Sequence, residues 1–250
     1  DPMILPNVRA SFGRTEAGFL IGLTAGTDRI AREREEDRLQ HEGFDAILDD
    51  PRTLNALMSP GRISAAPAPL VFYILVRHAL LEDGVTNRIV ADYLPALLLQ
   101  FARGSRAHRA TDDGHAPTYD YLVDIVEALG SAQGREAFLL RAHLGNFALW
   151  LSGVFPDHIA ARVERRGATG IRYYAQMGAT GYRLAAGTID AETWGLVRLY
   201  ETFAENFPVL RIALNRIADR YLFPSTGDPV DRLLRQIADK VERQSQSRMN

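Results

Sequence analysis

The chain has 250 residues, a formal net charge of −2, no cysteine and one lysine, Lys240. The near-neutral charge argues against a nucleic-acid binder, and the lack of cysteine excludes disulfides, thiolate catalysis and cysteine-ligated metal centres. No cofactor motif, secretory signal or apolar run long enough to span a membrane is found. We therefore expect a soluble, cytoplasmic protein that carries no cofactor.

The first part of the chain predicts helices joined by a linker. One helix is expected from Glu16 to about Leu39, and short helices are expected over 44–48 and 51–58. Residues 59–69 are rich in proline, serine, alanine and glycine, a composition typical of a linker.

That linker suggests a division of the chain. We predict an N-terminal helical segment over 1–60 and a main helical domain over 61–250. One continuous domain over 1–250 is the alternative.

Two strongly apolar helices are predicted in the middle of the chain. The first covers 70–83, and the second covers 138–155, where Pro156 ends it and a short basic helix follows. A helix that is apolar nearly all round is usually buried in a protein core. Between them, a helix over 86–102 and a helix over 119–129 flank a polar loop.

Further helices are expected over 170–186, 188–206 and 208–221, and a last one from Asp228. Glycine in a helix interior is unfavourable, so Gly178 and Gly181, like Gly145, indicate close packing of backbones.

No strand pattern is present. The predicted fold class is therefore all-α: an irregular multi-helix domain of about nine to eleven helices around two buried central helices.

Polar side chains on the central helices form the main candidate site. A buried guanidinium needs a partner, and a buried imidazole or amide needs hydrogen bonds. Arg141, His143 and Asn146 could bind an anionic or polar ligand together with Arg77 and His78. Alternatively, these groups are bonded within the protein, because buried ion pairs are also structural devices.

Other polar groups give weaker candidates. The basic residues Arg162, Arg165, Arg166 and Arg172, beside Tyr173 and Tyr174, could clamp a phosphate or carboxylate, or they could form a solvated face. Asp112, Asp113 and His115 in the polar loop are too few for a convincing metal site, so no metal is predicted. His78 and Glu82, four residues apart, could act as an acid–base dyad or as a structural pair.

Some of these residues resemble a family of uncharacterised bacterial proteins of unknown function. The resemblance covers roughly 70–186. It lies in Arg77-His78, in the run from Arg141 to Asn146 with Trp150, in Arg165-Arg-Gly167, and in Tyr173-Tyr174. It implies a bacterial, helical protein and brings no activity with it.

The sequence leaves three functions open. The leading hypothesis is binding of a small anionic or polar ligand by the following residues: Arg77, His78, Arg141, His143, Asn146, Tyr173 and Tyr174. The second is a structural or interaction protein, either a homo-oligomer or a subunit of a complex. The third is an enzyme with His78 or His143 as general base, although no catalytic residue can be assigned.

Overall fold

The computed structural model describes residues 3–102, 107–110, 117–167 and 169–224. The described residues form fourteen α-helices and no strand, so the protein is all-α as predicted. None of these helices is long and apolar enough to cross a membrane.

The chain divides into two compact units, which we call the N-terminal unit and the C-terminal unit. The first covers residues 3–107, and the second begins at His108. Residues 61–107 thus cluster with the helices that precede them, whereas the sequence suggested a division at residue 60.

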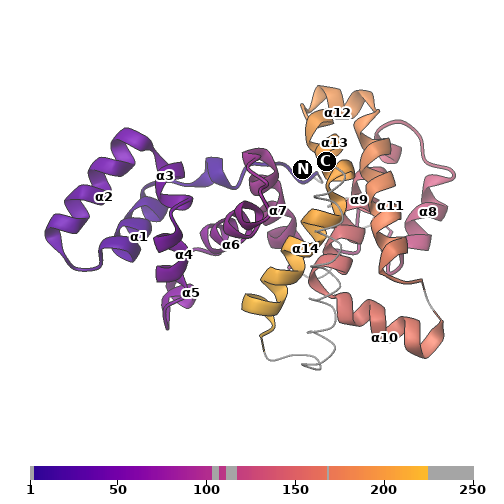
Figure 1. Ribbon diagram of the computed structural model, residues 1–250. Helices are drawn as coiled ribbons and strands as arrows, with labels where there is room; N and C mark the ends of the chain where they lie inside the picture. Colours follow the sequence, from indigo (N-terminus) through magenta and orange to yellow (C-terminus); the bar gives the residue numbers. More distant parts are fainter. Residues whose placement is uncertain (1–2, 103–106, 111–116, 168, 225–250) are drawn as a thin grey trace. The chain divides into compact units, whose positions relative to one another are not determined.

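Seven α-helices and a short 3-10 helix (Arg9–Ser11) make up the described part of the N-terminal unit (Figure 1). The α-helices are α1 (Arg14–Ala25), α2 (Arg29–Glu42), α3 (Phe44–Leu48), α4 (Pro51–Leu57), α5 (Arg62–Ala65), α6 (Ala68–Glu82) and α7 (Arg88–Phe101). The short helix α5 lies within the predicted linker, and α6 packs against α7 and α4.

The single helix predicted from Glu16 to Leu39 is wrong. It is broken into α1 and α2 at Gly26, whose φ of 61° lies in the left-handed region. The side chain of Asp28 then accepts hydrogen bonds from the backbone N–H groups of Ile30 and Ala31 and caps α2. A glycine that ends one helix and an aspartate that begins the next are common boundary signals.

Seven α-helices and a π-helical turn (Ala218–Leu222) form the described part of the C-terminal unit. The α-helices are α8 (Leu122–Leu129), α9 (Gly134–Val154), α10 (Pro156–Arg166), α11 (Ile171–Ala186), α12 (Ile189–Thr193), α13 (Val197–Glu205) and α14 (Phe207–Ile217). The predicted helix over 188–206 is therefore two helices, separated at Gly195, whose φ is 66°.

Helix α9 is the centre of the C-terminal unit, with α8, α10, α11 and α14 packed against it (Figure 1). Helix α11 comes close because both helices carry glycine at the contact. A Cβ on Gly181 would lie 2.8 Å from the carbonyl oxygen of Arg141 and from the nitrogen of Gly145, and a Cβ on Gly145 would lie 2.7 Å from the ring of Tyr182. The close packing predicted from these interior glycines is confirmed.

Helix α14 is fixed to the end of α9 by one buried amide. Nδ2 of Asn215 donates hydrogen bonds of 3.0 Å to the carbonyl oxygens of Ser152 and Gly153 and one of 2.8 Å to that of Arg211. Gly153 allows this approach, since a Cβ there would lie 2.8 Å from Leu214. The helix predicted from Asp228 lies outside the described residues.

Candidate functional site

Arg77 and His78 are buried in the N-terminal unit and bonded within it. Arg77 donates from Nε and Nη2 to the two carboxylate oxygens of Asp49, at 2.8 and 2.9 Å, and from Nη1 to the carbonyl oxygen of Thr86 at 3.0 Å. Nε2 of His78 lies 3.0 Å from the carbonyl oxygen of Leu48. All three guanidinium nitrogens of Arg77 are therefore occupied, which favours the structural interpretation of this pair.

The bonds to Asp49 have an electrostatic consequence. Burial alone would raise the pKa of Asp49, but the hydrogen bonds and charges of Arg77 and Arg88 outweigh it, and the pKa lies below its ordinary value. The pKa of His78 is lowered mainly by burial, against the opposing effect of its bond to Leu48. Asp49 is therefore a carboxylate and His78 a neutral imidazole near pH 7.

Asn146 and His143 are buried on α9 in the C-terminal unit, with exposed fractions of 5% and 4%. Oδ1 of Asn146 accepts a 2.9 Å hydrogen bond from the hydroxyl of Tyr182. His143 lies among aromatic rings, 6.0 Å from Phe147 and 6.1 Å from Tyr119 between ring centroids. Burial, and to a lesser degree the nearby His108, lowers its pKa to about 3.

Arg141, also on α9, is partly exposed and forms no hydrogen bond or ion pair with its side chain among the described residues. Tyr173 and Tyr174 begin α11, with their rings 6.2 Å apart and nearly perpendicular. Tyr174 is buried, and burial raises its pKa, while the charge of Arg162 acts in the opposite direction.

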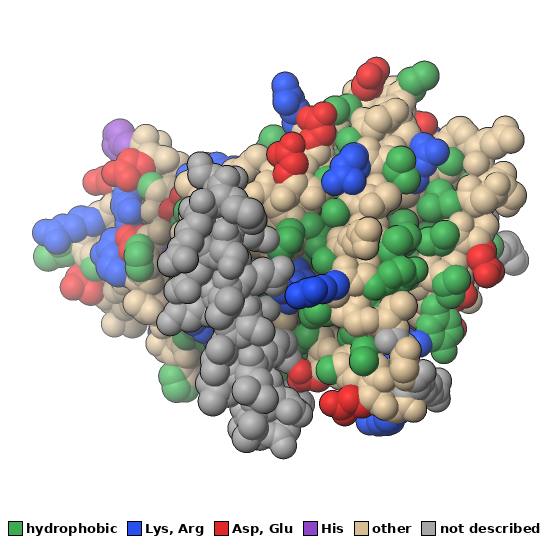
Figure 2. Space-filling model, turned by 45° about the vertical axis from the view of Figure 1, so that its right-hand side comes forward, with side chains coloured by type: hydrophobic (Ala, Val, Ile, Leu, Met, Phe, Trp, Pro, Cys, Tyr) green, Lys and Arg blue, Asp and Glu red, His purple; other side chains and the backbone are tan. Residues whose placement is uncertain are grey.

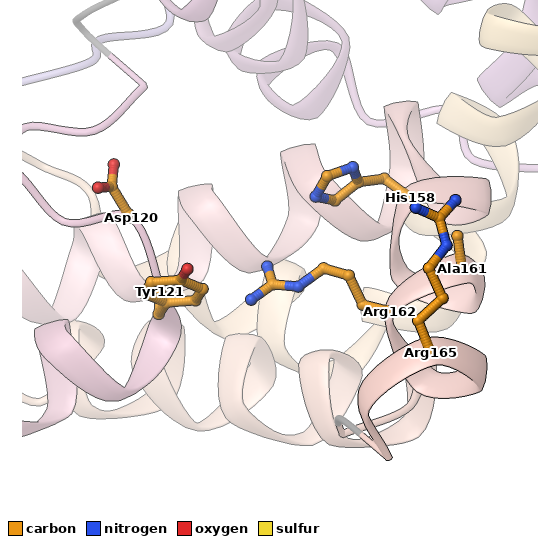
Figure 3. Close-up of a pocket in the computed structure, with 6 residues that line it drawn as sticks. All are labelled: Asp120, Tyr121, His158, Ala161, Arg162 and Arg165. Carbon is orange, nitrogen blue, oxygen red and sulfur yellow. The ribbon is translucent and has the colours of Figure 1, made fainter.

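A pocket of about 410 Å³ lies elsewhere in the C-terminal unit (Figure 3). Its lining consists of Asp120, Tyr121, His158, Ala161, Arg162 and Arg165. The first two residues precede α8, and the other four belong to α10. This pocket is the candidate functional site.

The sequence of α10 explains why four of its residues share one side of the pocket. Pro156 lacks the N–H that would continue α9, so the chain turns and α10 starts there. Positions 158, 161, 162 and 165 are spaced by three and four residues, and such positions fall on one helix face. Gly167, with a φ of 61°, ends the helix.

The backbone of Tyr121, at the beginning of α8, is held in place by a hydrogen bond to the side chain of Asp124. Its N–H donates a 3.1 Å hydrogen bond to Oδ2 of Asp124, the reciprocal half of an N-terminal capping arrangement. The guanidinium carbon of Arg162 lies 4.6 Å from the centroid of the Tyr121 ring, a cation–π contact visible in Figure 3. The ring therefore positions one of the two pocket arginines.

The charges around the pocket are not paired with one another. Neither Arg162 nor Arg165 forms an ion pair with a carboxylate among the described residues. Asp120 is engaged instead by His108, whose Nδ1 lies 3.2 Å from Oδ1 of Asp120 and 3.1 Å from the carbonyl oxygen of Tyr119. The pocket thus offers two guanidinium groups and an imidazole on α10, with one carboxylate beside Tyr121.

Part of this site was predictable. The sequence indicated Arg162 and Arg165 as a possible anion clamp but placed Tyr173 and Tyr174 beside them, and neither tyrosine lines the pocket. Asp120, Tyr121 and His158 were missed. The spacing of His158, Arg162 and Arg165 along one helix face was the available signal, whereas the approach of Tyr121 depends on tertiary structure.

No group of three or more histidine and acidic side chains that could hold a metal is present among the described residues. Asp112, Asp113 and His115 lie outside them. Comparison with protein-family models, curated proteins and solved structures gives no match. The resemblance to an uncharacterised bacterial family therefore stays a prediction.

Proposed function

We propose that the protein binds a small molecule bearing a phosphate or carboxylate group in the pocket between α10 and Tyr121. The observation that carries the proposal is that neither Arg162 nor Arg165 at the pocket has a carboxylate partner within the part of the chain that the structure describes. Guanidinium groups match phosphate and carboxylate oxygens in geometry and charge, and charge-assisted hydrogen bonds are the stronger kind.

The pocket has the size of a small-molecule site and a mainly charged lining, which suits a charged ligand. Its volume lies in the range of about 300–1,000 Å³ that is typical of small-molecule pockets, and it combines an aromatic ring with a few polar groups. Arg77 and His78 support the proposal less, because their hydrogen-bonding groups are used within the N-terminal unit.

Native mass spectrometry of the purified protein is the first test. A reproducible extra mass that is lost on denaturation supports the proposal and gives the mass of the ligand. Titration with ethyl phosphate and citrate, followed by NMR chemical shifts, then measures anion binding directly.

Two variants make the titration specific. Arg165→Gln should weaken binding of these anions by about tenfold, the loss of one charge-assisted hydrogen bond. Arg183→Gln is the matched control, because Arg183 is an exposed arginine on α11 that does not line the pocket. Absence of binding to the natural protein, or equal weakening by both variants, overturns the proposal.

An interaction function is the second candidate. Leu184, Ile189 and Trp194 lie at the end of α11 and around α12, with exposed fractions of 48%, 80% and 39%. Exposed large apolar side chains that gather in a patch are typical of protein interfaces, and these three residues are near one another in the sequence. On the face shown in Figure 2, acidic and basic side chains are interspersed, so this face carries no large patch of one charge. Light scattering of the natural protein and of Ile189→Asp tests this candidate: a defined oligomer that the substitution dissociates supports it, and a monomer contradicts it.

A further inference from the structure

Asp120 gives the pocket a negatively charged group in addition to the positively charged arginines, so the pocket has two poles of opposite charge. It lines the same cavity as Arg162 and Arg165, but no ion pair joins its carboxylate to either arginine. In Figure 3, Asp120 and Tyr121 lie on one side of the pocket and His158 and Arg165 on the other, while Arg162 reaches from α10 towards the Tyr121 ring. Opposite charges that face one cavity without meeting leave space for a molecule that contacts both.

The carboxylate of Asp120 keeps hydrogen-bonding capacity for such a molecule. Its Oδ1 lies 3.2 Å from Nδ1 of His108. Oδ2 accepts no hydrogen bond from the described residues. An ionised carboxylate only accepts hydrogen bonds, so its complement is a donor, and a cationic donor adds charge attraction.

The Tyr121 ring limits the kind of ligand that the pocket can accept. One of its faces is covered by the guanidinium of Arg162 at 4.6 Å. A flat aromatic ligand that stacked on that face would have to displace the arginine from its cation–π contact. An aliphatic ligand can reach both poles and leave this contact in place.

We propose that the pocket takes a small aliphatic molecule with an ammonium group at one end and a phosphate group at the other. The phosphate binds between His158, Arg162 and Arg165, and the ammonium group donates to Asp120. This inference rests on the proposed anion site and adds the second recognition group to it.

Three probes test the anion site and the ammonium site separately. Phosphoethanolamine carries both poles, whereas ethyl phosphate has the same phosphate without the ammonium group. Glycerophosphoethanolamine carries both poles on a phosphodiester, as a lipid headgroup does. We expect phosphoethanolamine to bind about three- to tenfold more tightly than ethyl phosphate, as measured by NMR titration or calorimetry. Tighter binding of the diester than of the monoester identifies a headgroup as the source of the ligand, and the reverse identifies a free phosphomonoester; either order is consistent with the bipolar site.

Asp120→Asn tests the role of the carboxylate. It should lower the affinity for phosphoethanolamine to that for ethyl phosphate, and it should leave ethyl phosphate binding unchanged or slightly tighter because a negative charge near the anion is removed. Glu127→Gln is the matched control, since Glu127 is an exposed acid on α8 that does not line the pocket. Thermal unfolding of both variants shows whether each is folded.

The outcomes are distinct. Equal affinity of the natural protein for phosphoethanolamine and ethyl phosphate, or equal weakening of both probes by Asp120→Asn, overturns the bipolar ligand and leaves the anion site intact. Failure of all three probes to bind overturns the bipolar ligand, and failure of citrate to bind as well overturns the anion site.

Discussion

The hydroxyl of Tyr182 on α11 donates a 2.9 Å hydrogen bond to Oδ1 of Asn146 on α9, and both side chains are buried. Burial raises the pKa of Tyr182 well above its ordinary value, so the hydroxyl keeps its proton and remains a donor. The ring lies directly against Gly145, where a side chain would leave no room for it. Asn146 is thus a link between two core helices.

Removal of this hydroxyl should weaken the C-terminal unit. Tyr182→Phe keeps the ring but takes away the donor to a buried amide oxygen, which costs about 1–3 kcal/mol of unfolding free energy. Both tryptophans, Trp150 and Trp194, lie in the C-terminal unit, so urea unfolding followed by tryptophan fluorescence reports on this part of the chain. An unchanged midpoint would show that the bond does not stabilise the unit. Binding of ethyl phosphate by the folded variant should be unaffected.

Gly181→Ala should be destabilising although alanine favours helices. The added methyl group would lie 2.8 Å from the backbone of α9, and forcing the helices apart costs about 1–3 kcal/mol. Gly18→Ala is the control. Gly18 lies in the interior of α1 with no atom near its would-be Cβ, so this change should stabilise by up to about 1 kcal/mol. Urea unfolding followed by circular dichroism measures both, and the same sign of change in the two variants would contradict the packing argument.

The helices were predictable because periodicity and capping residues are local signals. The observed bounds of α3, α4 and α6, and the end of α9 before Pro156, lie within about three residues of the bounds predicted from the sequence. The breaks at Gly26 and Gly195 were missed. Glycine inside a helical pattern indicates either a turn or a packing contact, and Gly26 and Gly181 show both outcomes. Only the position of a neighbouring helix distinguishes them.

The candidate site was less predictable for the same reason. Buried polar residues were visible on the central helices, but the partners that occupy them, such as Asp49 for Arg77 and Tyr182 for Asn146, lie 28 and 36 residues away in the chain. The arginines of α10 were visible as well. Their association with Tyr121 and Asp120 depends on how α8 and α10 are placed around the core, which no local pattern encodes.

Loss of the Asp49 carboxylate should destabilise the N-terminal unit. Asp49→Asn leaves the guanidinium of Arg77, whose side chain is 3% exposed, without its charge partner, and we expect a loss of about 2–4 kcal/mol in unfolding free energy. Glu33→Gln is the control, because the Arg29–Glu33 pair is 83% and 57% exposed and should contribute less than about 0.5 kcal/mol. Hydrogen exchange of the α6 amides reports the local effect. Similar exchange rates in the two variants would mean that the buried pair contributes no more than the exposed one.

His143 should make the stability of the C-terminal unit depend on pH. Its pKa is about 3 in the folded protein and 6.5 in the unfolded chain. Above pH 6.5 the imidazole is neutral in both states, and its contribution to stability is fully present. As the pH falls from 6.5 towards 3, the unfolded chain binds a proton that the folded protein excludes, so stability falls by up to about 1.4 kcal/mol per pH unit.

His143→Gln removes this titration and should reduce the slope of unfolding free energy against pH by up to one proton over that interval. Urea unfolding at a series of pH values, followed by tryptophan fluorescence, gives the slopes of the variant and of the natural protein. If the His143→Gln slope matches that of the natural protein, His143 is protonated in the folded state, and its ring cannot be sealed among Tyr119 and Phe147 as the structure places it.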